Sequence, residues 1–118
     1  EPTAGLDPKA HKDVLAMIEE VHRRTGNITI LVSHNMADIA GLSDKVLVID
    51  SGRMVTIGTP KEVFSHRREL SGLDLPPITQ LTESLRDRGM EIGETILSID
   101  EAADRIAEYL NDKGKNGC

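Results

Sequence analysis

The sequence predicts an α/β fold that is followed by a small α-rich extension. Three observations support this prediction. Apolar residues recur at helical spacing between residues 9 and 25, and a continuous β-rich run, residues 28–33, follows that segment. Two further apolar runs flank Ser51-Gly52, which is typical of a β-hairpin turn. The remainder of the chain shows helical spacing only.

Composition limits the classes of protein to which the chain can belong. Its 118 residues are 38% hydrophobic and 29% charged, which suits a soluble globular domain. A net charge of −6 disfavours nucleic-acid binding, because that function usually needs a concentrated basic face. Cys118 is the only cysteine, so a disulfide framework is excluded. No apolar run approaches the length of a membrane-spanning helix.

The first predicted helix has clear start and stop signals. Asp7 suits the N-cap, Pro8 suits the first helical position, and Gly26 supplies the stop. Its apolar stripe consists of Val14, Met17, Ile18 and Val21. The run 28–33 has no polar alternation, which is how a strand buried on both faces of a parallel sheet appears. We therefore expect helix 9–25 to cross over to a buried parallel strand.

The pattern of the next segment, from residue 35 to about residue 66, predicts the closing part of an α/β layer. A short helix is predicted over residues 35–42, and the hairpin strands over residues 45–50 and 53–57. Thr59 and Glu62 fit a capping box that begins another short helix. Parallel strands, a crossover helix and a hairpin together predict the fold of residues 1–66.

The extension, residues 67–118, contains two predicted helices. Gly89 ends the first, whose predicted packing face consists of Ile78, Leu81 and Leu85. Ser98 and Glu101 form a capping box that begins the second. The stripe of the second helix consists of Ile99, Ala103, Ile106 and Leu110. This stripe is wide enough for a partner helix, although packing on its own domain is the favoured interpretation.

Two short motifs carry the candidate chemistry. Glu1 opens the run EPTAGLD, and His34 ends the run ILVSH. A glutamate beyond the carboxyl end of a strand can polarise an attacking water, although Glu1 read alone is a solvated charge. His34 read alone is a histidine hydrogen-bonded at a strand end, yet a neutral imidazole can also donate to a phosphate oxygen. Asp7 read alone is the cap of the first helix.

EPTAGLD followed by LVSH resembles the second half of an ATP-binding-cassette (ABC) nucleotide-binding domain of the P-loop type. The resemblance implies that Glu1 is the catalytic glutamate and that His34 is the switch histidine, which contacts the γ-phosphate. It also implies that one turn is the D-loop, which reaches the partner's site in a closed dimer. The residues of this turn are Ala4, Gly5, Leu6 and Asp7.

The resemblance continues through SGRMVTIGTPKEVF to about residue 66. LSGLDLPPITQLTESLRDRGMEI and SIDEAADRIAEYL then resemble the C-terminal extension of energy-coupling-factor (ECF) transporter ATPases. In that branch, which imports cobalt, nickel and vitamins, the extension joins the two ATPase subunits. Residues 1–66 are thus interpreted as the C-terminal part of the ABC ATPase core, and residues 67–118 as a subunit-contact region.

The resemblance implies an ATPase that drives import of a metal ion or vitamin, with ATP and Mg²⁺ as cofactors. Its partners would be a second ATPase subunit, identical or paralogous, a transmembrane coupling subunit and a substrate-binding membrane component. The protein would lie peripherally on the cytoplasmic face of the membrane. Two alternatives stay open. One is a non-catalytic dimerisation or docking module, and the other is a soluble ABC-type ATPase of DNA repair or translation.

The printed sequence contains no G-x-x-x-x-G-K-[ST] loop, the motif that cradles nucleotide phosphates. The family's signature motif and its Walker B aspartate are also missing. We therefore expect the phosphate-binding half of the site, with most of the Mg²⁺ ligands, to lie outside this sequence. On that expectation, the chain alone does not hydrolyse ATP.

Overall fold

A computed structural model describes residues 2–66 and 73–116 of the chain. The predictions for Glu1, for the start of the extension and for Cys118 lie outside these residues. The elements in chain order are α1 (Pro8–Thr25), α2 (Met36–Leu42), β1 (Val46–Asp50), β2 (Arg53–Gly58), α3 (Pro60–Ser65), α4 (Pro77–Asp87) and α5 (Ile99–Asn116). The α/β class is therefore confirmed.

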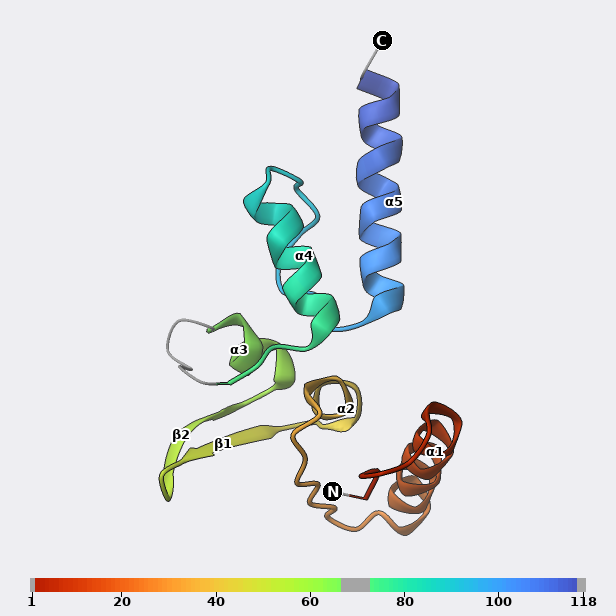
Figure 1. The fold of residues 1–118 in the computed structure, drawn as a ribbon, viewed down its shortest axis with the longest axis vertical. Helices are drawn as coiled ribbons and strands as arrows, with labels where there is room; N and C mark the ends of the chain where they lie inside the picture. Colours follow the sequence, from red (N-terminus) through yellow and green to blue (C-terminus); the bar gives the residue numbers. More distant parts are fainter. Residues whose placement is uncertain (1, 67–72, 117–118) are drawn as a thin grey trace.

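The elements are spread along one axis. The molecule measures 54 × 32 × 28 Å, and its radius of gyration is 16.7 Å. A compact chain of this size would have a radius of gyration of about 13–14 Å. Helices α4 and α5 lie side by side at one end, and the hairpin and α1 lie toward the other end, on opposite sides of α2 (Figure 1). No helix in the described part of the chain is both long and apolar enough to cross a membrane.

The hairpin forms as predicted. Strands β1 and β2 pair antiparallel, with Val46 opposite Gly58 and Asp50 opposite Arg53. Ser51 and Gly52 both have positive φ angles, 50° and 76°, as the two central residues of a type I′ turn require. The register shifts once between Val48 and Ile49, so the hairpin carries a β-bulge.

Local capping places α2 and α3 where the sequence predicts them. The side chain of Asn35 accepts hydrogen bonds from the backbone N–H groups of Ala37 and Asp38 at the start of α2. The Thr59–Glu62 capping box at the start of α3 is complete, with bonds of 3.2 and 3.0 Å. These caps satisfy N–H groups that a short helix leaves without partners inside the helix.

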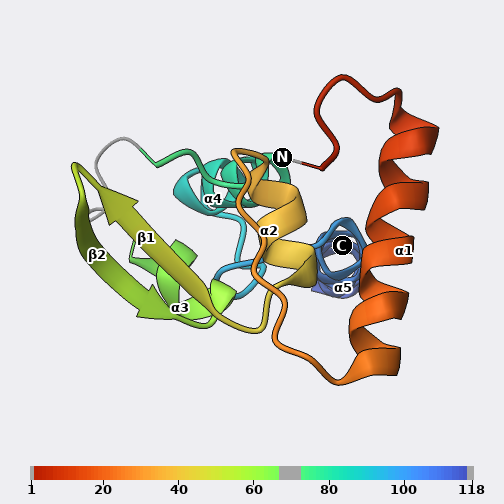
Figure 2. The ribbon, with the colours of Figure 1, turned by 90° about the horizontal axis from the view of Figure 1, so that it is seen from below.

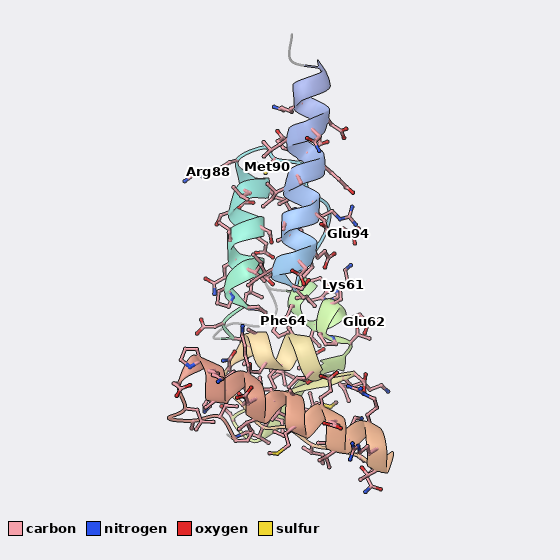
Figure 3. All side chains as sticks on the ribbon, turned by 90° about the vertical axis from the view of Figure 1, so that its right-hand side faces the viewer. Lys61, Glu62, Phe64, Arg88, Met90 and Glu94 are labelled. Carbon is pink, nitrogen blue, oxygen red and sulfur yellow. The ribbon has the colours of Figure 1, made fainter. Side chains whose placement is uncertain are left out.

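One buried cluster joins the helices to the hairpin. Its members are Ile39 of α2, Val46 of β1, Val63 and Phe64 of α3, and Leu75. The side chain of Phe64 is completely buried. It lies between α2 and the lower ends of α4 and α5 (Figure 3). This aromatic side chain is therefore the centre of the cluster that joins α2, α3 and β1.

Helix α4 packs through part of the predicted face and through two threonines. Ile78 and Leu85 pack against the cluster of Ile92, Ile96 and Ala102, as predicted. Thr79 and Thr82 are buried, whereas Leu81 is 52% exposed. The Thr79 hydroxyl donates to the carbonyl of Ile96 at 2.6 Å, and the Thr82 hydroxyl donates to the carbonyl of Ile78 at 3.0 Å. The loop that faces α4 presents a backbone carbonyl, so a threonine there supplies a donor that leucine lacks.

The buried face of helix α5 is rotated from the predicted stripe and shares Ile106 with it. Ser98 caps it by accepting from the backbone N–H of Glu101 at 3.2 Å, as expected. Ile99 and Leu110 of the predicted stripe are 73% and 58% exposed. The residues that pack inward are Ala102, Ile106 and Tyr109, against a cluster that includes Ile92 and Ile96. Ala102 is 2% exposed and packs against these loop residues, so the buried face lies next to the predicted one.

The predicted parallel strand over residues 28–33 is wrong for the described structure. The segment is irregular, and Ile28, Ile30 and Val32 are 92%, 85% and 75% exposed. A strand needs a neighbour to pair its backbone N–H and C=O groups. Among residues 2–66 and 73–116 the sheet contains only β1 and β2, which pair with each other. The parallel part of the expected fold is therefore not seen.

Replacement of Phe64 tests the central cluster. Phe64→Ala should lower the free energy of unfolding by about 3–5 kcal/mol, because it leaves a cavity among side chains that cannot close over it. Urea denaturation followed by circular dichroism measures the change. Leu47→Ala, at a position of β1 that is 49% exposed, is the control and should cost far less. Equal losses in the two variants would contradict this account of the core.

Candidate functional site

The turn that precedes α1 is built from the EPTAGLD motif. Thr3 is nearly buried, and its carbonyl accepts from the backbone N–H of Leu6 at 3.3 Å. Gly5 has a φ angle of +76°, which a glycine adopts without strain. Asp7 Oδ1 accepts from the backbone N–H of Ala10 at 2.8 Å, so the predicted helix cap is confirmed.

The predicted D-loop residues are accessible on this turn. Ala4, Gly5, Leu6 and Asp7 are all exposed, and Leu6 retains 41% of its surface. The turn lies immediately before the N-terminal end of α1 and can meet another molecule without rearrangement of the helix. Glu1, the proposed water-activating residue, lies outside the described residues.

His34 lies in the irregular segment that leads to α2. Its side chain is exposed. Ser33 Oγ accepts from the backbone N–H of Asn35 at 3.0 Å, and Asn35 in turn caps α2. His34 is therefore set between two residues whose side chains fix the local backbone. An exposed imidazole here can donate or accept a hydrogen bond with a bound group.

The two helices that directly follow these motifs, α1 and α2, are joined by a polar contact. Nε2 of His11, on α1, lies 2.8 Å from Oδ1 of Asp38, on α2. Asp38 is only 8% exposed, and His11 is half-buried. His11 is therefore not a fully exposed residue of α1. His11 lies at helical spacing from Val14 and Ile18 and continues their half-buried face. This spacing is the feature of the sequence that indicates its partial burial.

A second polar feature lies on the extension. An open groove of about 570 Å³ runs between the loop at Glu91 and helix α5. Lys113 Nζ lies 5.3 Å from the ring centre of Tyr109. A side-chain hydrogen bond with Tyr109 raises the pKa of the Lys113 ammonium, because it favours the charged form. The groove mixes both signs of charge, and none of its residues belongs to the D-loop or to the His34 segment.

Metal-binding capacity can be judged for the described residues. No group of three or more His, Cys, Asp or Glu side chains lies close enough together in ranges 2–66 and 73–116 to hold a metal ion.

Comparison with known proteins gives the chain its relatives. Over 112 residues, or 93% of its length, it is 50% identical to the energy-coupling factor transporter ATP-binding protein EcfA2 of Caldanaerobacter subterraneus subsp. tengcongensis, and it covers 39% of that protein. The EcfA2 protein of Symbiobacterium thermophilum is 43% identical over the whole chain, which covers 41% of it. The chain is homologous to the C-terminal part of these transporter ATP-binding proteins.

The match extends to a second protein of the same transporter type. The EcfA1 protein of C. subterraneus subsp. tengcongensis is 40% identical over 90% of the chain, which covers 39% of it. The chain thus spans about two fifths of the length of the curated relatives it matches. No protein-family model matches it. The similarity to energy-coupling factor proteins covers both the motif turn and the helical extension.

Two substitutions separate the capping role of Asp7 from a role of its charge. Asp7→Ala should cost about 1 kcal/mol of folding free energy, because the N–H of Ala10 loses its partner. Asp7→Asn should cost much less, because an amide oxygen caps equally well. Hydrogen exchange of the first-turn amides of α1 measures the difference. Equal damage by the two changes would contradict the capping role.

Proposed function

We propose that this chain is the C-terminal part of the ATP-hydrolysing subunit of an energy-coupling factor importer. The observation that carries the proposal is the continuous similarity to EcfA2 proteins, which includes 43% identity over the whole chain in one relative. Similarity confined to residues 1–66 would have fitted a soluble ABC-type ATPase equally well. Similarity through the extension favours the transporter ATPase.

The proposed chemistry assigns one role to each motif. Glu1 activates the attacking water as a general base, and the imidazole of His34 donates a hydrogen bond to the γ-phosphate. The D-loop, Ala4–Asp7, reaches the active site of a second subunit. The exposure of His34 and of this turn supports these roles, since both must meet groups that this chain does not supply. ATP hydrolysis would then drive import of a metal ion or a vitamin.

The nucleotide itself needs residues from outside this chain. The printed sequence has no phosphate-binding loop, and the described residues form no metal-binding group. The phosphates of ATP and the accompanying Mg²⁺ would take most of their ligands from the rest of the subunit. Residues 28–33 would also gain a neighbouring strand there, which would bury Ile28, Ile30 and Val32 in a parallel sheet.

The proposed partners follow from the extension. Ile99 and Leu110 stand exposed on one side of α5, while Ala102 faces inward. An exposed apolar stripe on a helix suits contact with another subunit. We expect a second ATP-binding subunit there, with membrane components completing an importer on the cytoplasmic face of the membrane. A paralogue is plausible, because one organism has both EcfA1 and EcfA2 relatives of this chain.

The non-catalytic docking module is the second candidate function. The exposed residues of α5 favour it, because they suit a contact and not a reaction. Substitution of Glu1 and His34 separates the two functions, because only the ATP-hydrolysing function needs these side chains.

Substitution of the proposed catalytic residues tests the main proposal. In an ATP-binding subunit of the relatives' full length that carries this sequence, Glu1→Gln should leave ATP binding intact and lower kcat at least a hundredfold. His34→Ala should lower kcat to a similar extent, because the γ-phosphate loses a donor. Steady-state phosphate release and nucleotide binding are the measurements. The 118-residue chain alone is the negative control. Hydrolysis that survives both substitutions would refute these roles.

A charge on α5 tests the subunit contact. Leu110→Glu should shift the chain from an associated form to a monomer, because it places a carboxylate in an apolar interface. Asn111→Glu, at the next exposed position of α5, is the matched control and should have little effect. Sedimentation velocity at several concentrations measures the association. A chain that is monomeric before any substitution would count against this contact.

A further inference from the structure

A polar interaction joins α1 to α2. Helix α1 has no buried residue and contributes none to either buried cluster. It lies alongside α2 (Figure 2), where His11 Nε2 meets Asp38 Oδ1 at 2.8 Å. A carboxylate only accepts hydrogen bonds, so Nε2 carries the proton and donates it. With Asp38 only 8% exposed, loss of this donor would leave a nearly buried charge unpaired.

One end of this contact is connected by one further hydrogen bond to a proposed site residue, and the other end to the neighbour of a proposed site residue. The backbone N–H of His11 donates to the carbonyl of Asp7, the last residue of the D-loop, at 2.9 Å. The backbone N–H of Asp38 donates to Oδ1 of Asn35 at 3.2 Å, and Asn35 directly follows His34. A continuous hydrogen-bonded path therefore runs from the D-loop to the residue next to His34.

We propose that His11 and Asp38 are positioning residues that set the D-loop relative to His34. The inference rests on the proposed function of those two motifs. Phosphoryl transfer asks the protein mainly for positioning and electrostatics. A displacement of about 1 Å in such a site can lower the rate about a hundredfold. The contact acts through the backbones at its two ends.

The chemistry of the pair provides a rescue variant. His11→Leu removes the donor while retaining a side chain of similar size. His11→Gln restores it, because the amide nitrogen of glutamine reaches roughly as far as Nε2 and also donates. His22→Leu is the matched control on the same helix, since His22 Nδ1 is hydrogen-bonded to the nearby Thr29 Oγ1, at 2.9 Å. A purely structural contact and a positioning contact then make different predictions.

Steady-state ATP hydrolysis by a subunit of the relatives' full length carrying this sequence is the first test. His11→Leu should lower kcat about ten- to a hundredfold while the KM for ATP changes less than about twofold. His11→Gln should recover most of kcat, and His22→Leu should leave it unchanged. An unchanged kcat in His11→Leu would overturn the proposal. A loss that His11→Gln fails to rescue, or that raises KM equally, would also overturn it.

Hydrogen exchange on the 118-residue chain is the second test, and it does not require ATP hydrolysis. His11→Leu should speed exchange at the amides of Ala37 and Asp38 and in residues 33–35, while His22→Leu should affect only the end of α1 and the residues next to its partner Thr29. No change at α2 would overturn the positioning link. If exchange responds as expected but Glu1→Gln and His34→Ala leave hydrolysis intact, the proposed function has failed and so has the role built on it.

Discussion

Burial of Phe64 is the constraint on which the described structure depends. This side chain has no exposed surface, and its cluster holds α2, α3 and β1 together. The position of α2 determines in turn where Asp38 and the segment that carries His34 are found. The motif turn is tied to this unit through α1 and its polar contact with α2. A small apolar core thus carries two exposed segments that the family resemblance assigns to catalysis.

The features that the sequence predicts correctly are the local ones. The Asp7 cap, the Ser51-Gly52 turn and the Thr59–Glu62 capping box depend on residues within a few positions of one another. Strand 28–33 depends on a neighbour, and none is present among residues 2–66 and 73–116. The packing face of α5 depends on the loop that covers it, because Ala102 packs against Ile92 and Ile96 of that loop. Spacing alone does not contain this information.

In the candidate site too, local features could be predicted from the sequence and contacts between distant residues could not. Gly5 and Asp7 do on their turn what their residue types predict, and His34 is exposed as a residue that meets a ligand must be. The partner of His11 could not be predicted, because Asp38 follows it only after a helix and a long irregular segment. Homology supplies what geometry does not, since the relatives link the motif turn and the extension in one kind of transporter protein.

The central claim is that His34 and the D-loop belong to an ATP site shared between two subunits. Its most direct test is a structure of the subunit at the relatives' full length, trapped with ATP by Glu1→Gln. We predict that a nitrogen of His34 lies about 3 Å from a γ-phosphate oxygen. The Ala4–Asp7 turn should face the nucleotide of the partner. An ATP-bound dimer in which His34 lies more than about 8 Å from every phosphate oxygen, well beyond hydrogen-bond reach, would contradict the account.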